Sequence, residues 1–408
     1  MLHIDGVNSD YLDFFVNCVD NILLLLQRGR MFNQYLHFSV SVCARIKSVK
    51  QLRPHYYINL SRLSTTVPST AMADVTNGNS GKVTIGTHNG SFHCDETLAC
   101  SMLKLLDRFK DAEIVRTRDQ SLLDKCDIVV DVGGVYDPEA KRFDHHQKTF
   151  THTINSLDSN KKWSIKLSSA GLVYFHYGRE IISTILGTQV QDKVTEKVFD
   201  KVYENFIQEI DAIDNGINAH DGEPRYSIST NLSSRVSNLS PNWNDQEQNF
   251  DVGFYKAMDL TRSEFVDKVS YYGKVWWAAR DIVSKCIQER FNVHSSGRVL
   301  EFSQGGVPWK EHLFELEAEE GLSGDNSILY VLYTDQNGMW RIQCVPEQPK
   351  SFSNRLSLPE AWRGVRDQDL EKVSNISGAT FVHAGGFIGG NKTRDGVVAM
   401  AEVALKQL

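Results

Sequence analysis

The 408-residue sequence lacks any Cys-x-x-Cys pair and any long apolar run. Its seven cysteines are scattered, so they predict neither a disulfide framework nor a cysteine-based zinc site, and they indicate a reducing compartment. The longest purely aliphatic run covers only residues 22–26, whereas a membrane-spanning helix needs roughly 20 apolar residues. The composition therefore predicts a soluble protein that does not associate with a membrane.

An excess of basic residues is also missing. Lys and Arg number 44 against 51 Asp and Glu, which gives a formal net charge of -7. This charge argues against a protein that binds nucleic acid by wholesale electrostatic attraction. It leaves room for a nucleic-acid enzyme with a metal-filled cleft, because metal ions bring their own positive charge. The length and the ordinary content of hydrophobic residues, 41%, suggest two domains with substantial cores.

Residues 1–81 are predicted to be an N-terminal targeting or disordered segment. Residues 31–73 contain no acid, are rich in Ser and Thr, and carry five basic residues, a composition typical of a mitochondrial transit peptide. Four aspartates in the first thirty residues do not fit a presequence, so translation could begin at Met31, or the acidic start could mask the signal. Met72 could start a shorter cytosolic or nuclear form. The alternative is a disordered tail without a targeting role.

From Lys82 onward the pattern predicts alternating strands and helices. Strands are expected at residues 82–88, 112–119 and 127–134, with helices at residues 95–109 and 121–126. This β-α-β-α-β succession implies an α/β fold with a parallel sheet and right-handed crossovers. Ligands bind beyond the carboxyl ends of such strands, and His88 and Asp131 both fall at those ends.

The remaining chain divides into three predicted regions. Residues 82–250 form a metal-binding catalytic domain, residues 251–296 a linker region with a long amphipathic helix at 262–291, and residues 297–408 a smaller α/β domain. Strands are expected at 297–302, 327–335 and 338–346, and the last two are joined by a hairpin because Asn337-Gly338 accepts positive φ. A final helix is expected at 393–405.

Potential metal ligands are concentrated in four segments of the first predicted domain. They are His88, His93 and Asp95; Asp131; Asp144, His145 and His146; and Asp214. Two divalent cations need such a mixed set of imidazoles and carboxylates, with one carboxylate reaching both, and they supply a hydroxide at neutral pH. For residues 88–96 alone, the alternative is a polar turn whose acids cap a helix.

Four motifs in this order resemble the DHH phosphoesterase superfamily and, within it, the MYG family of metal-dependent exonucleases. They are "THNGSFHCDE", "VVDVGG", "FDHHQ" and "AIDNG", followed by "HAGGFIGGNKTRDG". "LSSAGLVY" is similar to the family's segment behind the metal site. The resemblance covers residues 82–408 and implies a parallel-sheet phosphoesterase domain with a C-terminal substrate-binding domain.

The same resemblance implies roles for the clustered residues. It places the first cation on His88 and Asp131, with Asp131 bridging, and the second on Asp95, Asp131, His145 and Asp214. It implies that His146 contacts the scissile phosphoryl oxygen. Asp144 would then orient a ligand histidine, as ligating imidazoles usually require.

The chain departs from the superfamily pattern at His93. A carboxylate is expected four residues after the first histidine, but this run is one residue longer and places His93 there. If His93 ligates, the first site is rich in imidazole and favours Mn²⁺, or Zn²⁺, over Mg²⁺. Glu96 is interpreted as a helix N-terminal charge, and Asp211 as a solvated helix acid whose change to Asn should matter little.

The glycine-rich segment 383–396 has two interpretations. It is either a tight turn that needs glycine for positive φ and close packing, or a cradle for a substrate phosphate at a helix N-terminus. We favour the cradle, whose predicted substrate-binding residues are His383, Gly385, Gly386, Gly389, Gly390, Lys392 and Arg394.

The predicted activity is phosphodiester hydrolysis by a hydroxide that two metals activate. The resemblance points to RNA or single-stranded nucleic acid trimmed from the 3′ end. One alternative is hydrolysis of pyrophosphate, polyphosphate or a small dinucleotide, and another is a regulatory protein that keeps the metal site without turnover. The intact set of ligands argues against the regulatory protein. The sequence does not indicate an oligomeric state.

Overall fold

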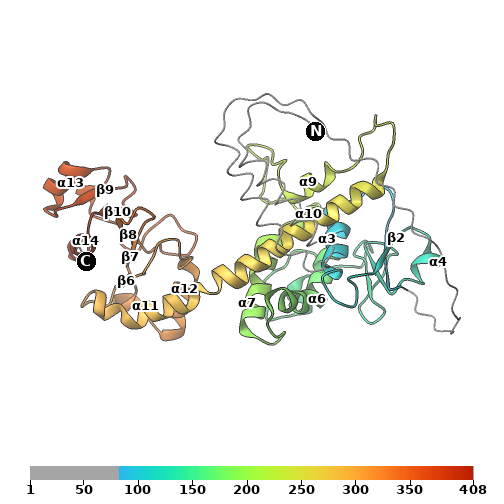
Figure 1. Cartoon of the computed structure of the whole chain (residues 1–408), viewed down its shortest axis with the longest axis horizontal. Coiled ribbons are helices and arrows are strands. Elements are labelled where there is room, and N and C mark those ends of the chain that lie inside the picture. Colours follow the sequence, from blue (N-terminus) through green and yellow to red (C-terminus); the bar gives the residue numbers. More distant parts are fainter. Residues whose placement is uncertain (1–81, 408) are drawn as a thin grey trace, which may run out of the picture. The chain divides into compact units, whose positions relative to one another are not determined.

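The computed structural model describes residues 82–407 (Figure 1). The predicted targeting segment, residues 1–81, lies outside the described residues. Two five-stranded sheets form the framework of the described chain. The first core is mainly one large cluster of residues from 83–272, and the second core consists of two clusters, from residues of 293–405 and of 283–345. The predicted α/β class is therefore confirmed. No helix within residues 82–407 is long and apolar enough to cross a membrane.

The first sheet has the strand order β2-β1-β3-β5-β4. Its strands are β1 (Thr84–Thr87), β2 (Glu113–Arg116), β3 (Ile128–Val130), β4 (Tyr136–Asp137) and β5 (Arg142–Phe143). β2, β1, β3 and β5 are parallel, and β4 is antiparallel to β5. The predicted parallel sheet is thus confirmed, and the carboxyl ends of β1, β3 and β5 lie side by side along one edge.

Helices cover this sheet and complete its core. They are α3 (Cys94–Leu103), α4 (Gln120–Leu123), α5 (Ile154–Leu157), α6 (Ser169–Leu186), α7 (Lys193–Val202), the π-helical η2 (Tyr203–Ile207), α8 (Gln208–Asp214), α9 (Leu232–Ser237) and α10 (Phe250–Tyr271). α3 packs against both α6 and α10 (Figure 1). All ten residues of α3 are buried, so this helix is the centre of the helical layer.

The long helix differs from its predicted bounds. α10 begins at Phe250 rather than near Arg262, because the Asn249 side chain caps it by accepting from the Val252 N–H at 3.1 Å. Phe254 and Phe265 are fully buried in the first core. After the π-helical η3 (Tyr272–Trp276), α11 (Ala279–Val293) continues the chain and contributes to the second core. The residues predicted as a linker are therefore part of both cores.

The second sheet has the strand order β6-β7-β8-β10-β9. Its strands are β6 (Val299–Glu301), β7 (Tyr330–Thr334), β8 (Trp340–Cys344), β9 (Ala379–Val382) and β10 (Ile388–Asn391). The helices of this region are α12 (Lys310–Glu320), α13 (Asp367–Ser374) and α14 (Arg394–Leu405), with the short 3-10 helices η4 (Gly324–Asn326) and η5 (Glu360–Trp362). β7 and β8 form the hairpin that Asn337-Gly338 predicts, with Gly338 at φ +75°. The final helix is also where the sequence predicts it, with Thr393 as its N-cap.

Asp211 locks α8 to the start of α6. Its side chain is fully buried and accepts three hydrogen bonds, from the Ser168 N–H (3.0 Å), the Ser168 hydroxyl (2.8 Å) and the Tyr203 hydroxyl (3.0 Å). A Cβ at Gly171 would lie 2.2 Å from the Asp211 Oδ1 atom, so only glycine permits this approach. The interpretation of Asp211 as a solvated acid is wrong, because the π-helical segment η2 and α8 turn its face of the helix toward α6.

We predict that Asp211→Ala destabilises the protein by about 1–3 kcal/mol, the range for stranding a buried hydrogen-bond donor. Burial raises the pKa of Asp211 to about 7 despite the bonds from Ser168 and Tyr203, so its neutral form is well populated near neutral pH. The Asp211→Asn side chain resembles that neutral form and keeps an acceptor for Ser168. This variant should therefore lose less stability than Asp211→Ala.

Chemical denaturation of the two variants measures these losses. Glu209→Ala is the matched control, since Glu209 is exposed on the same helix and its removal should change the free energy of unfolding little. Equal losses for Asp211→Ala and Glu209→Ala would show that the bonds to Ser168 and Tyr203 do not hold α8 in place.

Candidate metal centre

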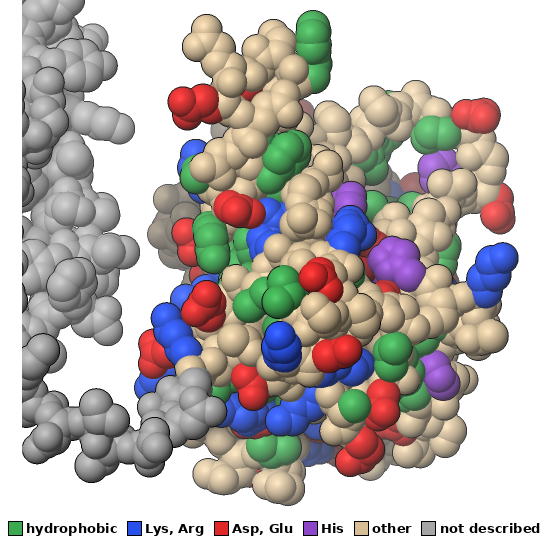
Figure 2. Space-filling model, turned by 90° about the vertical axis from the view of Figure 1, so that its right-hand side faces the viewer, with side chains coloured by type: hydrophobic (Ala, Val, Ile, Leu, Met, Phe, Trp, Pro, Cys, Tyr) green, Lys and Arg blue, Asp and Glu red, His purple; other side chains and the backbone are tan. Residues whose placement is uncertain are grey.

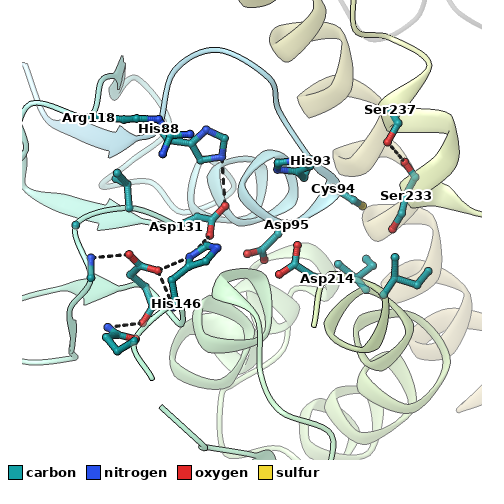
Figure 3. Close-up of a pocket in the computed structure, with 17 residues that line it drawn as sticks. His88, His93, Cys94, Asp95, Arg118, Asp131, His146, Asp214, Ser233 and Ser237 are labelled. Atoms are coloured by element: carbon teal, nitrogen blue, oxygen red, sulfur yellow. Dashed lines mark hydrogen bonds and ion pairs between the residues drawn. The ribbon is translucent and has the colours of Figure 1, made fainter. Parts of the chain in front are cut away.

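The predicted ligands converge where three adjacent parallel strands end. His88 follows β1, Asp131 follows β3, and the Asp144-His145-His146 run follows β5. The side chains of Asp95, from the first turn of α3, and of Asp214, from the end of α8, reach the same place (Figure 3). The predicted site residues from four separate motifs thus meet in one cluster with a buried centre and the exposed rings of His93 and His146 at its edge, and the order of strands in the sheet explains how they come together.

Asp131 lies between the two halves of this cluster. Its Oδ2 atom is 3.4 Å from the His88 Nε2 atom, and its Oδ1 atom is 3.6 Å from the His145 Nε2 atom. The residue has a φ of +56°, which costs energy outside glycine and is often found at functional sites. Its N–H donates to the Phe143 carbonyl at 3.1 Å, which holds this turn in place. Asp131 therefore has the position that a bridging ligand requires.

His145 is the centre of the second half. Its Nε2 atom lies 3.0 Å from Asp214 Oδ2 and 3.6 Å from Asp95 Oδ2. Both ring nitrogens are buried and have no hydrogen-bond partner with acceptable geometry within residues 82–407. The buried Nε2 atom thus lies among carboxylate oxygens without forming a well-aligned hydrogen bond to any of them. Ligands that are directed at a common ion have this arrangement. These residues therefore fit a divalent cation.

The amino end of α6 holds Asp95 in place. The backbone N–H groups of Ser169 and Ala170 donate to its two carboxylate oxygens, the first at 3.0 Å. The Ser169 hydroxyl also donates to Asp131 Oδ1 at 3.4 Å. This segment is the "LSSAG" stretch, whose small residues let the helix end approach two acids. The helix end, with its partial positive charge, thus stabilises carboxylates that would otherwise repel one another.

His88, His93 and Glu96 form the first half. The His88 Nε2 atom lies 3.2 Å from Glu96 Oε1, and the His93 Nδ1 atom lies 4.0 Å from Glu96 Oε2. The three residues are close enough to share an ion. Glu96 also accepts the His93 N–H at 2.9 Å, as a charge in the first turn of a helix does. It is fully buried, however, and its contact with His88 was not predicted.

Asp144 orients His146. Its Oδ1 atom accepts the His146 N–H at 3.0 Å and lies 2.8 Å from the His146 Nδ1 atom, while Oδ2 accepts the Gly134 N–H at 2.6 Å. His146 also lies close enough to Asp131 and His145 to share an ion with them, so the expectation that Asp144 orients a metal-ligating imidazole stays a prediction. The His146 ring is largely exposed, with its position set by Asp144, and it remains free to meet a substrate.

The electrostatics of the centre favour a cation. Burial lowers the pKa of His88, but hydrogen bonds to Asp131 and Glu96 outweigh it and raise the pKa to about 10. Burial likewise opposes the charge on His145, yet Asp131 and Asp214 raise its pKa to about 11. Burial, together with Asp214 and Asp131, raises the pKa of Asp95. The clustered carboxylates thus stabilise positive charge at this site. Protons on the histidines and on Asp95 provide it in the metal-free protein, and a divalent cation would take the place of these protons.

A cavity of about 690 Å³ opens onto these residues. Besides the predicted ligands, its wall includes Arg118, Ser233 and Ser237 (Figure 3). These three were missed by the sequence analysis, because they follow β2 or lie on α9 and belong to no motif. Figure 2 views the chain from the side of β2 and α4, and on this face basic and acidic side chains are interspersed.

The glycine-rich segment is divided between a turn and a strand. Gly385 and Gly386 lie between β9 and β10, and Gly386 has a φ of +68°. Gly389 and Gly390 lie in β10, which β8 and β9 flank on both sides, so their amides face neighbouring strands. The predicted phosphate cradle would need these amides to be free, whereas Gly389 and Gly390 are part of a paired strand. A Cβ at Gly390 would lie 2.8 Å from the Thr380 hydroxyl and 2.9 Å from the Phe381 ring, so packing against β9 explains this glycine.

The polar residues of this segment have partners of their own. Arg394 contacts Glu301 through Nε at 2.9 Å and through a terminal nitrogen at 2.7 Å. The His383 Nδ1 atom accepts the Gly385 N–H at 3.0 Å, and Lys392 is exposed. A role in substrate binding stays a prediction for these three residues.

Comparison with a solved structure gives a distant likeness. The chain matches RecJ from Thermus thermophilus, solved in complex with Mn²⁺, at 11% identity and a TM-score of 0.22, over 79% of this chain and 52% of that chain. A TM-score this low does not establish a shared fold.

Sequence comparisons give a much closer relationship. Residues 84–405 match the model of the MYG1 exonuclease family, described as an uncharacterised protein family (UPF0160). The chain is 53% identical to the MYG1 exonuclease of Homo sapiens over 324 residues, which cover 79% of this chain and 86% of the relative. It is 42% identical to a MYG1 protein of Saccharomyces cerevisiae over 330 residues, 79% and 95% of the two chains. The chain therefore belongs to the MYG1 exonuclease family.

Proposed function

We propose that this chain is a 3′–5′ exonuclease that hydrolyses phosphodiester bonds of RNA or single-stranded nucleic acid and uses two divalent cations, with Mn²⁺ preferred. Its membership of the family makes it a hydrolase of the exonuclease class. One observation carries the metal dependence, namely the position of Asp131 between the His88 and His145 halves of the centre. The substrate and the direction of trimming rest on the resemblance of the motifs.

The mixed imidazole and carboxylate groups fit divalent cations, and we expect two of them. His88 with Asp131 would hold one, and Asp95, Asp131, His145 and Asp214 would hold the other. When bound, such a pair lowers the pKa of a water molecule and neutralises charge on the phosphoryl group. The mixed imidazole and carboxylate ligands suit Mn²⁺ better than Mg²⁺, which prefers oxygen donors.

His146 and Arg118 supply the remaining polar groups for a phosphodiester. The hydrogen bond with Asp144 raises the pKa of His146, and because Nδ1 faces Asp144, the Nε2 atom is left to donate to a phosphoryl oxygen. Arg118 is exposed in the cavity wall and has no acidic partner within 4 Å among residues 82–407. Its guanidinium can bind a phosphate bidentately.

We expect the full chain with Mn²⁺ to shorten a 5′-labelled single-stranded RNA progressively from its 3′ end and to leave pyrophosphate intact. The cavity is open to solvent beside the metal ligands, so a long chain can lie across it. The test compares 5′-labelled and 3′-labelled RNA and DNA of equal sequence, together with pyrophosphate and short oligonucleotides.

Release of only mononucleotides from the 3′-labelled substrate at the earliest times supports the proposed direction. Loss of the 5′ label first would reverse the polarity. Phosphate release from pyrophosphate alone would favour the small-phosphate hydrolase, and no turnover of any substrate with Mn²⁺ bound would favour the regulatory protein.

Asp131→Asn should remove most of the activity, because the change withdraws charge from both halves of the centre while keeping the side chain's shape. We expect a loss of more than about a hundredfold in kcat/KM, beyond the range for losing an outer partner of a metal ligand. Calorimetric titration with Mn²⁺ should show weaker binding at both sites. Asp107→Asn is the control, since Asp107 is exposed on the surface. Undiminished binding of two Mn²⁺ ions by Asp131→Asn would contradict a bridging role.

We further propose that the segment 31–73 directs the chain to mitochondria. Its basic and hydroxyl-rich composition without acids supports this proposal. A reporter fused to residues 31–81 should be imported. A variant with Arg45, Lys47 and Lys50 changed to Gln should stay in the cytosol, and a cytosolic distribution of the unaltered fusion would refute the proposal.

A further inference from the structure

The Glu96 carboxylate is buried beside the metal centre, yet the motifs assign it no part there. It belongs to the first turn of α3 and is inaccessible to solvent. Its two oxygens accept a single backbone donor, the His93 N–H, at 2.9 and 3.0 Å. A carboxylate has about four acceptor positions, so one shared N–H leaves most of them without a donor.

Glu96 has no lysine or arginine partner among residues 82–407. Within residues 82–407, the basic groups within 4 Å of its oxygens are two imidazoles, those of His88 and His93. A buried carboxylate without a charged partner is costly. Without a metal, a proton on His88 supplies positive charge beside Glu96, but an imidazole that ligates a metal is neutral and cannot. Once His88 ligates a metal, the cation itself is therefore the positive charge that Glu96 faces.

The distances place that charge at the first cation. The His88 Nδ1 atom faces the Asn89 carbonyl at 3.3 Å, so Nε2 is the atom directed into the centre. It lies 3.2 Å from Glu96 Oε1 and 3.4 Å from Asp131 Oδ2. Two donor atoms that each lie about 2.1 Å from one ion are separated by about 3.0–3.4 Å. Each acid thus lies at the distance from His88 that two ligands of one ion have, and the ligand atoms of His88, His93 and Glu96 all lie close enough together to share an ion.

We propose that Glu96 is a ligand of the first cation, together with His88, His93 and the shared Asp131. The extra residue between His88 and His93 puts an imidazole where the superfamily pattern has a carboxylate. Glu96 restores that negative charge from the next turn of the chain. The first site then has two imidazoles and two carboxylates, a set that retains Mn²⁺ more firmly than imidazoles alone.

This inference rests on the metal centre of the proposed function and is separate from the choice of substrate. Its rival is that Glu96 only caps α3 through the His93 N–H. Glu96→Gln separates the two, because the Gln amide oxygen still accepts that N–H but is a neutral and weaker metal ligand. Glu96→Asp is the second variant, since it keeps the charge at the helix start but draws the oxygens back from His88.

The experiment titrates Mn²⁺ into the full chain by calorimetry and by the electron paramagnetic resonance of free Mn²⁺, with thermal unfolding in EDTA alongside. We expect Glu96→Gln to weaken one of two Mn²⁺ sites at least tenfold and to leave the metal-free unfolding temperature nearly unchanged. Asp214→Asn should weaken the other site. Glu113→Gln, at an exposed glutamate of β2, should change neither.

Unaltered Mn²⁺ binding by Glu96→Gln, with earlier unfolding in EDTA, would overturn the inference and assign Glu96 to the helix cap. If Glu96→Gln does not fold, Glu96→Asp decides, since full Mn²⁺ affinity in that variant would also overturn it. If the unaltered chain cuts no nucleic acid while Glu96→Gln still loses one Mn²⁺, the proposed function fails and the assignment of Glu96 holds.

Discussion

Repulsion among buried carboxylates is the constraint on which the rest of this structure depends. Asp95, Asp131 and Asp214 surround the His145 Nε2 atom at 3.0–3.6 Å, and Asp95 is fully buried. Negative charges this close are stable only when a fixed positive charge or hydrogen-bond donor faces each of them. The surrounding elements therefore serve to present backbone amides, imidazoles and a cation to these acids.

Two layers of support meet this requirement. The amino end of α6 donates its first amides to Asp95 and, through Ser168, to Asp211. Asp211 in turn fixes α8, whose last residue is Asp214. One helix end therefore sets the separation between two acids that come from distant parts of the chain. A mispositioned α6 would change the centre without altering any ligand, which connects the packing of the helical layer to its chemistry.

In the second sheet, a glycine-rich composition suggests a binding loop, but the glycines are there because neighbouring side chains pack closely against them. Gly389 and Gly390 lie in a strand flanked on both sides, and Gly390 makes room for Thr380 and Phe381 of the neighbouring strand. Glycine is required in both settings, for backbone access to a phosphate or for close approach of side chains. A glycine-rich segment alone does not distinguish them, and only the pairing of strands does.

The sequence by itself determined the α/β class, the parallel strands β1, β2 and β3, the β7–β8 hairpin and the final helix, but not β5, which precedes the Asp144-His145-His146 run. It also placed His88 and Asp131 at the carboxyl ends of parallel strands, which lie at one edge of the sheet, whereas the grouping of the other ligands followed from the resemblance of the motifs. Local periodicity and chain order contain this information. The tertiary structure alone decided the partners of Glu96, Asp144 and Asp211. Their contacts depend on how α3, the turn after β5, and α8 with α6 pack, and burial by distant elements leaves no local pattern.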